Sequence, residues 1–152
     1  MKRRRWADPP SRYLEEQTQV RVRFQEVDGL RIVWHGHYLT YFEEGRLAFG
    51  RRFGLEYRDV LEQGYVIPLV HAECDYYAPA RHGDVLTVVA RLHPEAAARL
   101  TFSFEVRAED QRLLAAGITV QAFTDPDGAL VLTRPAFYEA FLERWADQVV
   151  EP

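Results

Sequence analysis

The residues best suited to chemistry stand early in the chain, where one acidic side chain precedes the start of an expected helix. Asp28 lies in a loop, and the His35-Gly36 pair after it opens an aromatic-rich segment with helical patterning. A helix start offers free backbone N–H groups and roughly half a positive charge, so it can hold an ionised carboxylate and polarise a substrate carbonyl. A carboxylate beside such a site suggests hydrolysis of an acyl group.

A strand and a long helix are expected to position these groups. Residues 18–25 alternate apolar and polar side chains, which is the period-2 pattern of a half-buried strand. Residues 36–53 contain no proline and are apolar over more than half of a helical circumference, which suits a helix enclosed by a sheet better than one on a surface. A second, short helix is expected at residues 57–63, where Gly64 ends it.

The rest of the chain is predicted to be mostly β-structure. Four further strands are expected, at residues 66–77, 84–92, 99–108 and 112–123. Residues 109–111 join the last two as a hairpin, and Pro135 could start a terminal helix whose aromatic residues recur at helical spacing. This order is an α+β pattern in which one antiparallel sheet wraps one long central helix.

The composition indicates one globular domain and excludes several classes of function. The chain has 152 residues, of which 47% are hydrophobic, enough for a core in one domain. Its net charge is -4 and its basic residues are scattered apart from residues 2–5, so nucleic acid is not an expected partner. The one cysteine, Cys74, excludes an internal disulfide framework. No apolar leader follows the basic start and no stretch reaches the roughly 18 apolar residues of a membrane helix, so we expect a cytoplasmic protein without a membrane partner.

Two ordered motifs resemble those of the hotdog-fold acyl-CoA thioesterases, in the 4-hydroxybenzoyl-CoA thioesterase-like family. The first joins Val22-Arg23-Phe24 and Glu26-Val27-Asp28 to residues 32–46, which read IVWHGHYLTYFEEGR. The second is residues 75–84, DYYAPARHGD, which match the pattern D-Y-x-x-P-A-x-x-G-D. The resemblance covers residues 18–123 and implies a hotdog fold.

This resemblance also sets the expected division of the chain. Residues 1–17 are predicted to be a flexible N-terminal tail. Residues 18–133 are predicted to be the hotdog thioesterase domain, and residues 134–152 a C-terminal helix added to the same domain.

The resemblance further implies a mechanism. Asp28 would be the catalytic carboxylate, and the backbone N–H groups near His35 and Gly36 would polarise the thioester carbonyl. A thiolate leaves easily because the thiol pKa is about 8.5, so no strong general acid is needed. Asp28 could attack the carbonyl to form a mixed anhydride or activate a water molecule as a general base, and the sequence does not separate these routes. No cofactor is expected beyond the coenzyme A of the substrate.

Other residues near the motifs are candidates for contact with the substrate. Trp34 and Tyr38 flank the helix start, and Glu44 follows on the helix. Arg31 and Arg81 are the candidates for the phosphates of coenzyme A, because the chain lacks the glycine-rich phosphate-binding motifs. Arg31 also stands where the resembled family usually has glycine, and arginine does not reach a positive φ as cheaply as glycine does.

Several local alternatives stay open at the carboxylates. Asp28-Gly29 is a common turn dipeptide whose carboxylate could merely cap the backbone. Glu43 and Glu44 are rivals for the catalytic role, because another hotdog branch places its carboxylate on the central helix. Their structural interpretation is that Glu43 pairs with Arg46, while Glu44 faces solvent or a neighbouring subunit.

The histidines at the helix start also allow two interpretations. His35 could act through its imidazole or only through its backbone amide. His37 stands where the resembled family usually has asparagine and could alter the acyl pocket. Residues at i and i+2 of a helix point in different directions, so no metal site is expected here.

The acyl chain does not follow from the sequence. Aromatic residues could line a slot for an aromatic acyl group or fill the core, namely Tyr38, Tyr41, Phe42, Phe49, Tyr57, Tyr76 and Tyr77. A non-catalytic acyl-CoA or acyl-lipid binding module, an acyl-carrier-protein thioesterase and a dehydratase are alternative functions. The resemblance implies a homodimer or homotetramer, with two sheets joined edge to edge and the active site at the subunit interface.

Overall fold

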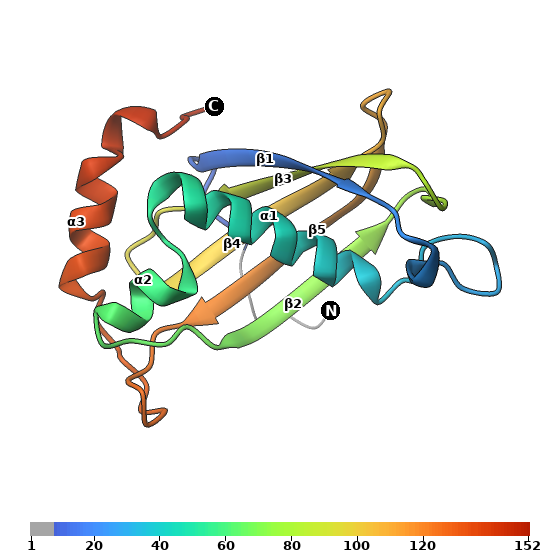
Figure 1. Cartoon of the computed structure of the whole chain (residues 1–152). Helices are drawn as coiled ribbons and strands as arrows, with labels where there is room; N and C mark the ends of the chain where they lie inside the picture. The colour runs from blue at the N-terminus through green and yellow to red at the C-terminus, as the bar shows by residue number, and fades with distance from the viewer. Residues whose placement is uncertain (1–7) are drawn as a thin grey trace, which may run out of the picture.

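The computed structural model describes residues 8–152, which form one antiparallel sheet with a long helix against it (Figure 1). The strands are β1 (Leu14–Arg21), β2 (Leu69–Tyr76), β3 (Val85–Leu92), β4 (Arg99–Arg107) and β5 (Leu113–Ala122). The helices are α1 (His37–Phe53), α2 (Tyr57–Glu62) and α3 (Ala136–Arg144), with 3-10 turns η1 (Phe24–Glu26) and η2 (Ala146–Gln148). None of the helices in this part of the chain is long and apolar enough to cross a bilayer.

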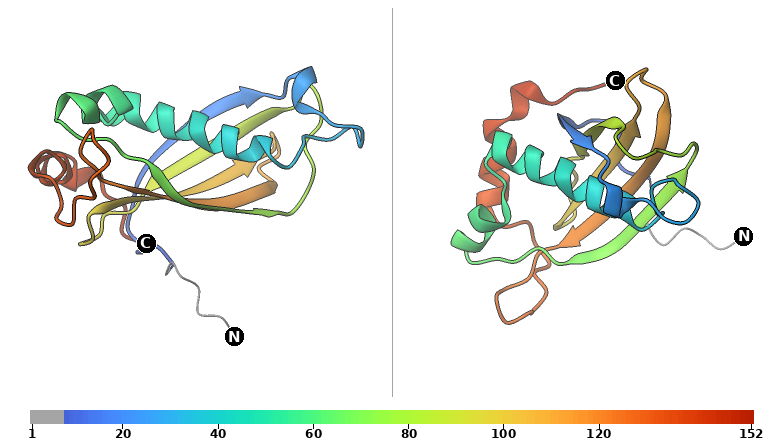
Figure 2. Two further views of the ribbon diagram at one scale, coloured as in Figure 1. Left: turned by 90° about the horizontal axis from the view of Figure 1, so that it is seen from below. Right: turned by 45° about the vertical axis from the view of Figure 1, so that its right-hand side comes forward.

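The sheet has the strand order β1-β3-β4-β5-β2, and all neighbouring strands are antiparallel. The two strands that flank α1 and α2 in the chain, β1 and β2, therefore form the two edges. Figure 2 shows α1 lying against one face of the curved sheet. This topology confirms the predicted α+β hotdog arrangement of one sheet around one long helix.

Aromatic residues of α1 form the centre of the core against β4. Phe42 stacks on Phe104 with ring centroids 4.8 Å apart, and Phe49 meets Phe102 edge-on at 5.1 Å. The helix ends at Gly54, whose φ of 76° lies in the left-handed region that glycine adopts readily. Enclosure by the sheet explains why so much of the helix circumference is apolar.

The first strand begins and ends earlier than predicted. The alternation of apolar residues runs on to Phe24, but the Phe24 side chain is 78% exposed and belongs to η1. The buried Glu26 carboxylate accepts a 2.8 Å hydrogen bond from the Arg23 N–H, which closes this turn. A side chain that bonds the local backbone competes with the sheet, so β1 stops at Arg21.

The N-terminal segment predicted as a tail is partly ordered in the sheet. Residues 14–17 belong to β1 and pair with β3. Tyr13 and Val150 exchange two backbone hydrogen bonds of 3.0 and 2.8 Å, which tie the segment before β1 to the end of the chain. Residues 1–7 of the predicted tail lie outside the described residues, and the domain boundary at residue 133 stays a prediction.

The C-terminal helix forms as predicted, directly after Pro135. The Trp145 indole N–H donates a 3.0 Å hydrogen bond to the Phe53 carbonyl, so the segment after α3 closes the C-terminal end of α1. Figure 1 shows α3 at the opposite end of the molecule from the loop that precedes α1. The helix therefore supports the scaffold and leaves the N-terminal end of α1 open.

Candidate active site

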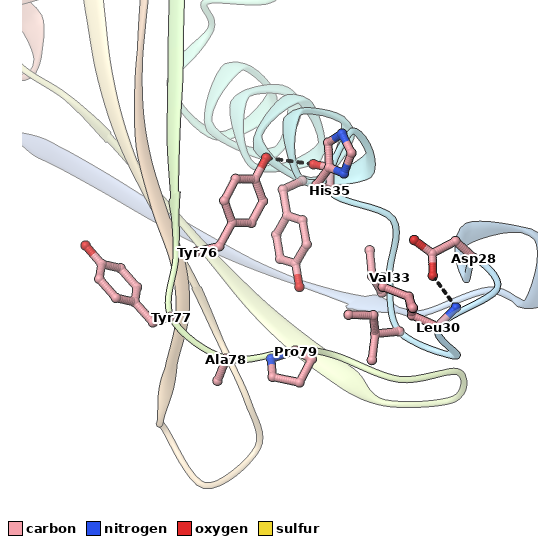
Figure 3. A pocket seen from close by; sticks show the side chains of 10 residues that line it. Asp28, Leu30, Val33, His35, Tyr76, Tyr77, Ala78 and Pro79 are labelled. Atoms are coloured by element: carbon pink, nitrogen blue, oxygen red, sulfur yellow. Dashed lines mark hydrogen bonds between the residues drawn. The ribbon is translucent and has the colours of Figure 1, made fainter.

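A pocket of about 360 Å³ lies at the N-terminal end of α1. It is lined by residues of the loop before α1, the helix start and the end of β2, namely Asp28, Leu30, Ile32, Val33, His35, Tyr38, Tyr76, Tyr77, Ala78 and Pro79. Figure 3 shows Asp28 and the loop on one side and the end of β2 on the other, with His35 between them. Asp28 provides the carboxylate of this otherwise mostly apolar lining.

The loop that carries Asp28 is held at both ends. Val27 and Val33 pair as an antiparallel bridge, which closes the loop on itself. Before the bridge, the buried Glu26 carboxylate accepts a 3.1 Å hydrogen bond from the Tyr41 hydroxyl of α1. The position of Asp28 relative to the helix is therefore set by contacts on both the loop and the helix.

Asp28 opens a tight turn in which its own side chain takes part. Its carbonyl accepts a 2.9 Å hydrogen bond from the Arg31 N–H, and its Oδ1 accepts a 2.8 Å hydrogen bond from the Leu30 N–H. The alternative interpretation of Asp28 as a turn cap is therefore correct locally. Within residues 8–152 the second carboxylate oxygen has no hydrogen-bond partner, so the cap leaves it available for chemistry.

Arg31 closes this turn with a φ of 62°, in the left-handed region where the resembled family usually has glycine. A residue with a Cβ pays roughly 1–2 kcal/mol to adopt that conformation. The exposed Arg31 side chain lines a second hollow beside Asp28, together with Phe24 and His82. The chain thus reaches the expected loop shape at the cost of backbone strain.

Replacing Arg31 by Gly is expected to raise the free energy of unfolding by roughly 0.5–1 kcal/mol. Relief of the strain gives about 1–2 kcal/mol, and the greater freedom of glycine in the unfolded chain offsets part of it. The midpoint of thermal unfolding should rise by about 2 °C. The control is Arg81→Gly, at a position without a positive φ, which should lower the midpoint. Equal shifts in the two variants would contradict strain at Arg31.

The start of α1 provides backbone donors next to the pocket. Gly36 is the N-cap residue and has no side chain to accept the helix N–H groups, while the His37 N–H donates to the Trp34 carbonyl at 2.9 Å. Within the described chain the N–H groups of His35 and Gly36 have no acceptor. They are the unpaired donors expected at a helix start.

Two tyrosines connect this helix start to β2. The Tyr76 hydroxyl donates a 2.8 Å hydrogen bond to the His35 carbonyl. Its ring meets the Tyr38 ring edge-on at 5.3 Å. Tyr38 is buried, and burial raises the pKa of its phenol, so this group stays neutral at physiological pH.

The structure brings some of the predicted site residues together. Asp28, His35 and Tyr38 line one pocket. Trp34 does not line it. The Trp34 side chain is 46% exposed and packs against the rings of His35 and His37, with centroid distances of 4.9 and 5.5 Å.

Four more predicted residues lie outside the pocket lining, namely Arg31, which lines the second hollow, and Gly36, Glu44 and Arg81. The Arg81 N–H donates a 2.8 Å hydrogen bond to the Asp84 carboxylate in the turn before β3. Of the apolar lining residues, Leu30 lies outside both sequence motifs, whereas Pro79 belongs to the second. Among the described residues no three His, Cys, Asp or Glu side chains could hold a metal ion together, and a metal-free site stays a prediction.

The predicted pair between Glu43 and Arg46 is wrong. The Glu43 carboxylate instead accepts a 2.8 Å hydrogen bond from the Tyr57 hydroxyl. Arg46 is buried against the sheet, where its guanidinium donates to the Leu55 carbonyl at 2.8 Å and to the Gln121 side chain at 3.4 Å. Burial lowers the pKa of Arg46. Both side chains contact Tyr57, Glu43 at its hydroxyl and Arg46 over its ring at 4.9 Å, so helical spacing brings them near each other without making them a pair.

Comparison with known proteins supports membership of a thioesterase family independently of the site geometry. A family model described as the thioesterase-like superfamily matches residues 12–144. A protein from Aquifex aeolicus is 38% identical over 90 residues, which are 59% of this chain and 70% of that protein. A 1,4-dihydroxy-2-naphthoyl-CoA hydrolase from Synechocystis is 30% identical over 96 residues, which are 62% of this chain and 70% of that protein.

The likeness extends to solved structures. The structure of a DHNA-CoA thioesterase from Staphylococcus aureus matches with a TM-score of 0.77 at 23% identity, over 87% of this chain and 91% of that one. At this identity the likeness supports the fold alone. For two further relatives, the matched stretch is only about half of their length, 51% and 52%.

Proposed function

The chain belongs to the thioesterase-like superfamily and is a thioesterase of the hotdog fold, and on that premise we propose that it hydrolyses an acyl-CoA thioester to a free acid and coenzyme A. One observation carries the proposal. The Asp28 carboxylate lies in an apolar pocket that also includes the start of α1, where two backbone amides are unpaired.

In the proposed reaction the thioester carbonyl sits between Asp28 and the helix start. Asp28 takes a proton from a water molecule whose oxygen bonds to the carbonyl carbon, or it bonds to that carbon itself and water then cleaves the mixed anhydride. In either route the C–S bond breaks and coenzyme A leaves as a thiolate. The N–H groups near His35 and Gly36 stabilise the oxyanion, and one such donor is typically worth about 2.7–4 kcal/mol. Water is the only co-substrate, so the proposal needs no cofactor.

The two hollows that meet at Asp28 suggest how the substrate lies. We assign the acyl group to the pocket with Tyr38, because its walls are apolar and aromatic. Arg31 lines the neighbouring hollow and is the stronger candidate for a phosphate of coenzyme A, with Arg81 as the other. The substrate contacts predicted for Trp34 and Glu44 have no support from the pocket lining and stay predictions.

The exposed edge strand β2 favours self-association of the chain. β2 ends the sheet on one side, and its Leu69 and Val70 side chains are 56% and 48% exposed. An exposed apolar edge is prone to pair with another strand. We therefore propose that two copies join along this edge as a homodimer, or as a tetramer of two dimers. The cytoplasmic location likewise stays a prediction.

Release of free thiol from a panel of acyl-CoA substrates tests the function. The panel contains acetyl-, hexanoyl-, palmitoyl- and benzoyl-CoA. Because the pocket holds about 360 Å³ and carries three tyrosines, kcat/KM is expected to be about tenfold higher for benzoyl-CoA than for palmitoyl-CoA. Faster hydrolysis of the same acyl group on acyl-carrier protein than on coenzyme A would make acyl-carrier protein the proposed carrier. Binding of the whole panel without thiol release would support a binding module instead.

A further inference from the structure

Tyr76 lies at the end of β2 and touches the start of α1 (Figure 3). Its hydroxyl donates a 2.8 Å hydrogen bond to the carbonyl oxygen of His35, a residue 41 positions away in the sequence. Building on the proposed function, we propose that Tyr76 is a positioning residue, which holds the amides at the start of α1 in place for the thioester oxyanion.

The hydrogen bond fixes the orientation of the His35–Gly36 peptide. In a trans peptide the C=O and the following N–H point in opposite directions, so holding the His35 carbonyl also sets the direction of the Gly36 N–H. Figure 3 places Tyr76 and Asp28 on opposite sides of His35. The N–H end of the held peptide therefore faces away from the Tyr76 hydroxyl. A carbonyl that accepts a hydrogen bond also polarises its peptide and makes the N–H a stronger donor.

The helix start has few other groups that could hold this peptide. Gly36, as the N-cap residue, contributes no side-chain cap. The His37 N–H bonds to the Trp34 carbonyl, which shapes the backbone but leaves the His35 carbonyl free. Within residues 8–152, Tyr76 is the one side chain that hydrogen-bonds to the His35–Gly36 segment.

Tyr76 is itself held firmly. Directly after it, the N–H groups of Tyr77 and Ala78 donate to the Leu114 carbonyl at 2.8 and 3.2 Å, which anchors the end of β2 to β5. The Tyr76 ring packs edge-on against Tyr38. Burial, with a smaller effect of a hydrogen bond to Cys74, raises the pKa of Tyr76 to about 12, so the hydroxyl keeps its proton over the working pH range.

The test is Tyr76→Phe, which keeps the ring and removes the hydroxyl. With hexanoyl-CoA and benzoyl-CoA as substrates, kcat is expected to fall about tenfold while KM stays within about twofold. A displaced oxyanion donor weakens the transition state more than it weakens substrate binding. The ratio of kcat/KM for the two substrates should stay unchanged, because the shape of the pocket is kept.

Tyr65→Phe is the matched control. Tyr65 lies outside the pocket lining, its ring packs against Phe137 with centroids 5.5 Å apart, and its hydroxyl has no hydrogen-bond partner within the described residues. Its kcat should equal that of the wild type. If the wild type hydrolyses these substrates and Tyr76→Phe has the same kcat, the positioning role is overturned while the proposed function stands. A large drop in the thermal midpoint of Tyr76→Phe would also overturn it, in favour of a structural role. No hydrolysis of any panel member by the wild type would overturn the proposed function itself.

Discussion

Replacing Asp28 by Asn is expected to lower kcat for acyl-CoA hydrolysis by about 10³-fold and to leave the fold intact. The asparagine side-chain oxygen can still accept the hydrogen bond that Asp28 takes from the Leu30 N–H, so the turn survives. The amide cannot take a proton from water or attack a carbonyl carbon. Thiol release at saturating acyl-CoA measures the loss, and thermal unfolding checks that the midpoint is unchanged.

Glu44→Gln is the matched control for this variant. It makes the same change from carboxylate to amide on α1, outside the pocket lining. It should keep most of the wild-type kcat. Full activity of Asp28→Asn with loss in Glu44→Gln would move the catalytic role to the helix carboxylate. Wild-type activity in both variants would show that neither carboxylate is the base or the nucleophile.

Periodicity predicted most of the fold because burial follows one face of each element. Residues 102–107 of β4 alternate between buried and half-buried positions, and most aromatic residues of α1 are buried against the sheet, although Leu39 is 43% exposed. The same reasoning failed at Phe24, where the alternation continues but the Glu26 carboxylate turns the chain. A single hydrogen bond from a side chain to the local backbone leaves no periodic signal, so the end of β1 could not be read from the pattern.

In the candidate site, contacts between residues close in the sequence could be predicted, and contacts between distant segments could not. The loop-to-helix motif placed Asp28 and His35 near each other, and both line the pocket. The contact of Tyr76 with the helix start joins segments far apart in the sequence, and the order of residues does not reveal it. Spacing also favoured a pair between Glu43 and Arg46, but burial of Arg46 against the sheet decided its partners.

Gly117 in β5 allows α1 to lie close to the sheet. It stands opposite Phe104 in β4 and opposite Cys74 in β2. A Cβ at this position would overlap the Phe42 ring of α1 and the backbone carbonyl oxygen of Glu73. The ring is stacked on Phe104 and the carbonyl belongs to a paired strand, so neither can move without disturbing the core or the sheet.

Replacing Gly117 by Ala is therefore expected to lower the free energy of unfolding by about 3 kcal/mol, because the methyl group overpacks the contact between α1 and β5. In a chain of this size the midpoint of thermal unfolding should fall by roughly 6–12 °C. The control is Gly29→Ala, where an added Cβ meets nothing within 4 Å, and its stability should stay within about 1 kcal/mol of the wild type. Equal stability of the two variants would mean that α1 lies farther from β5 than in this structure. The position of the helix start, on which the oxyanion site depends, would then have to change with it.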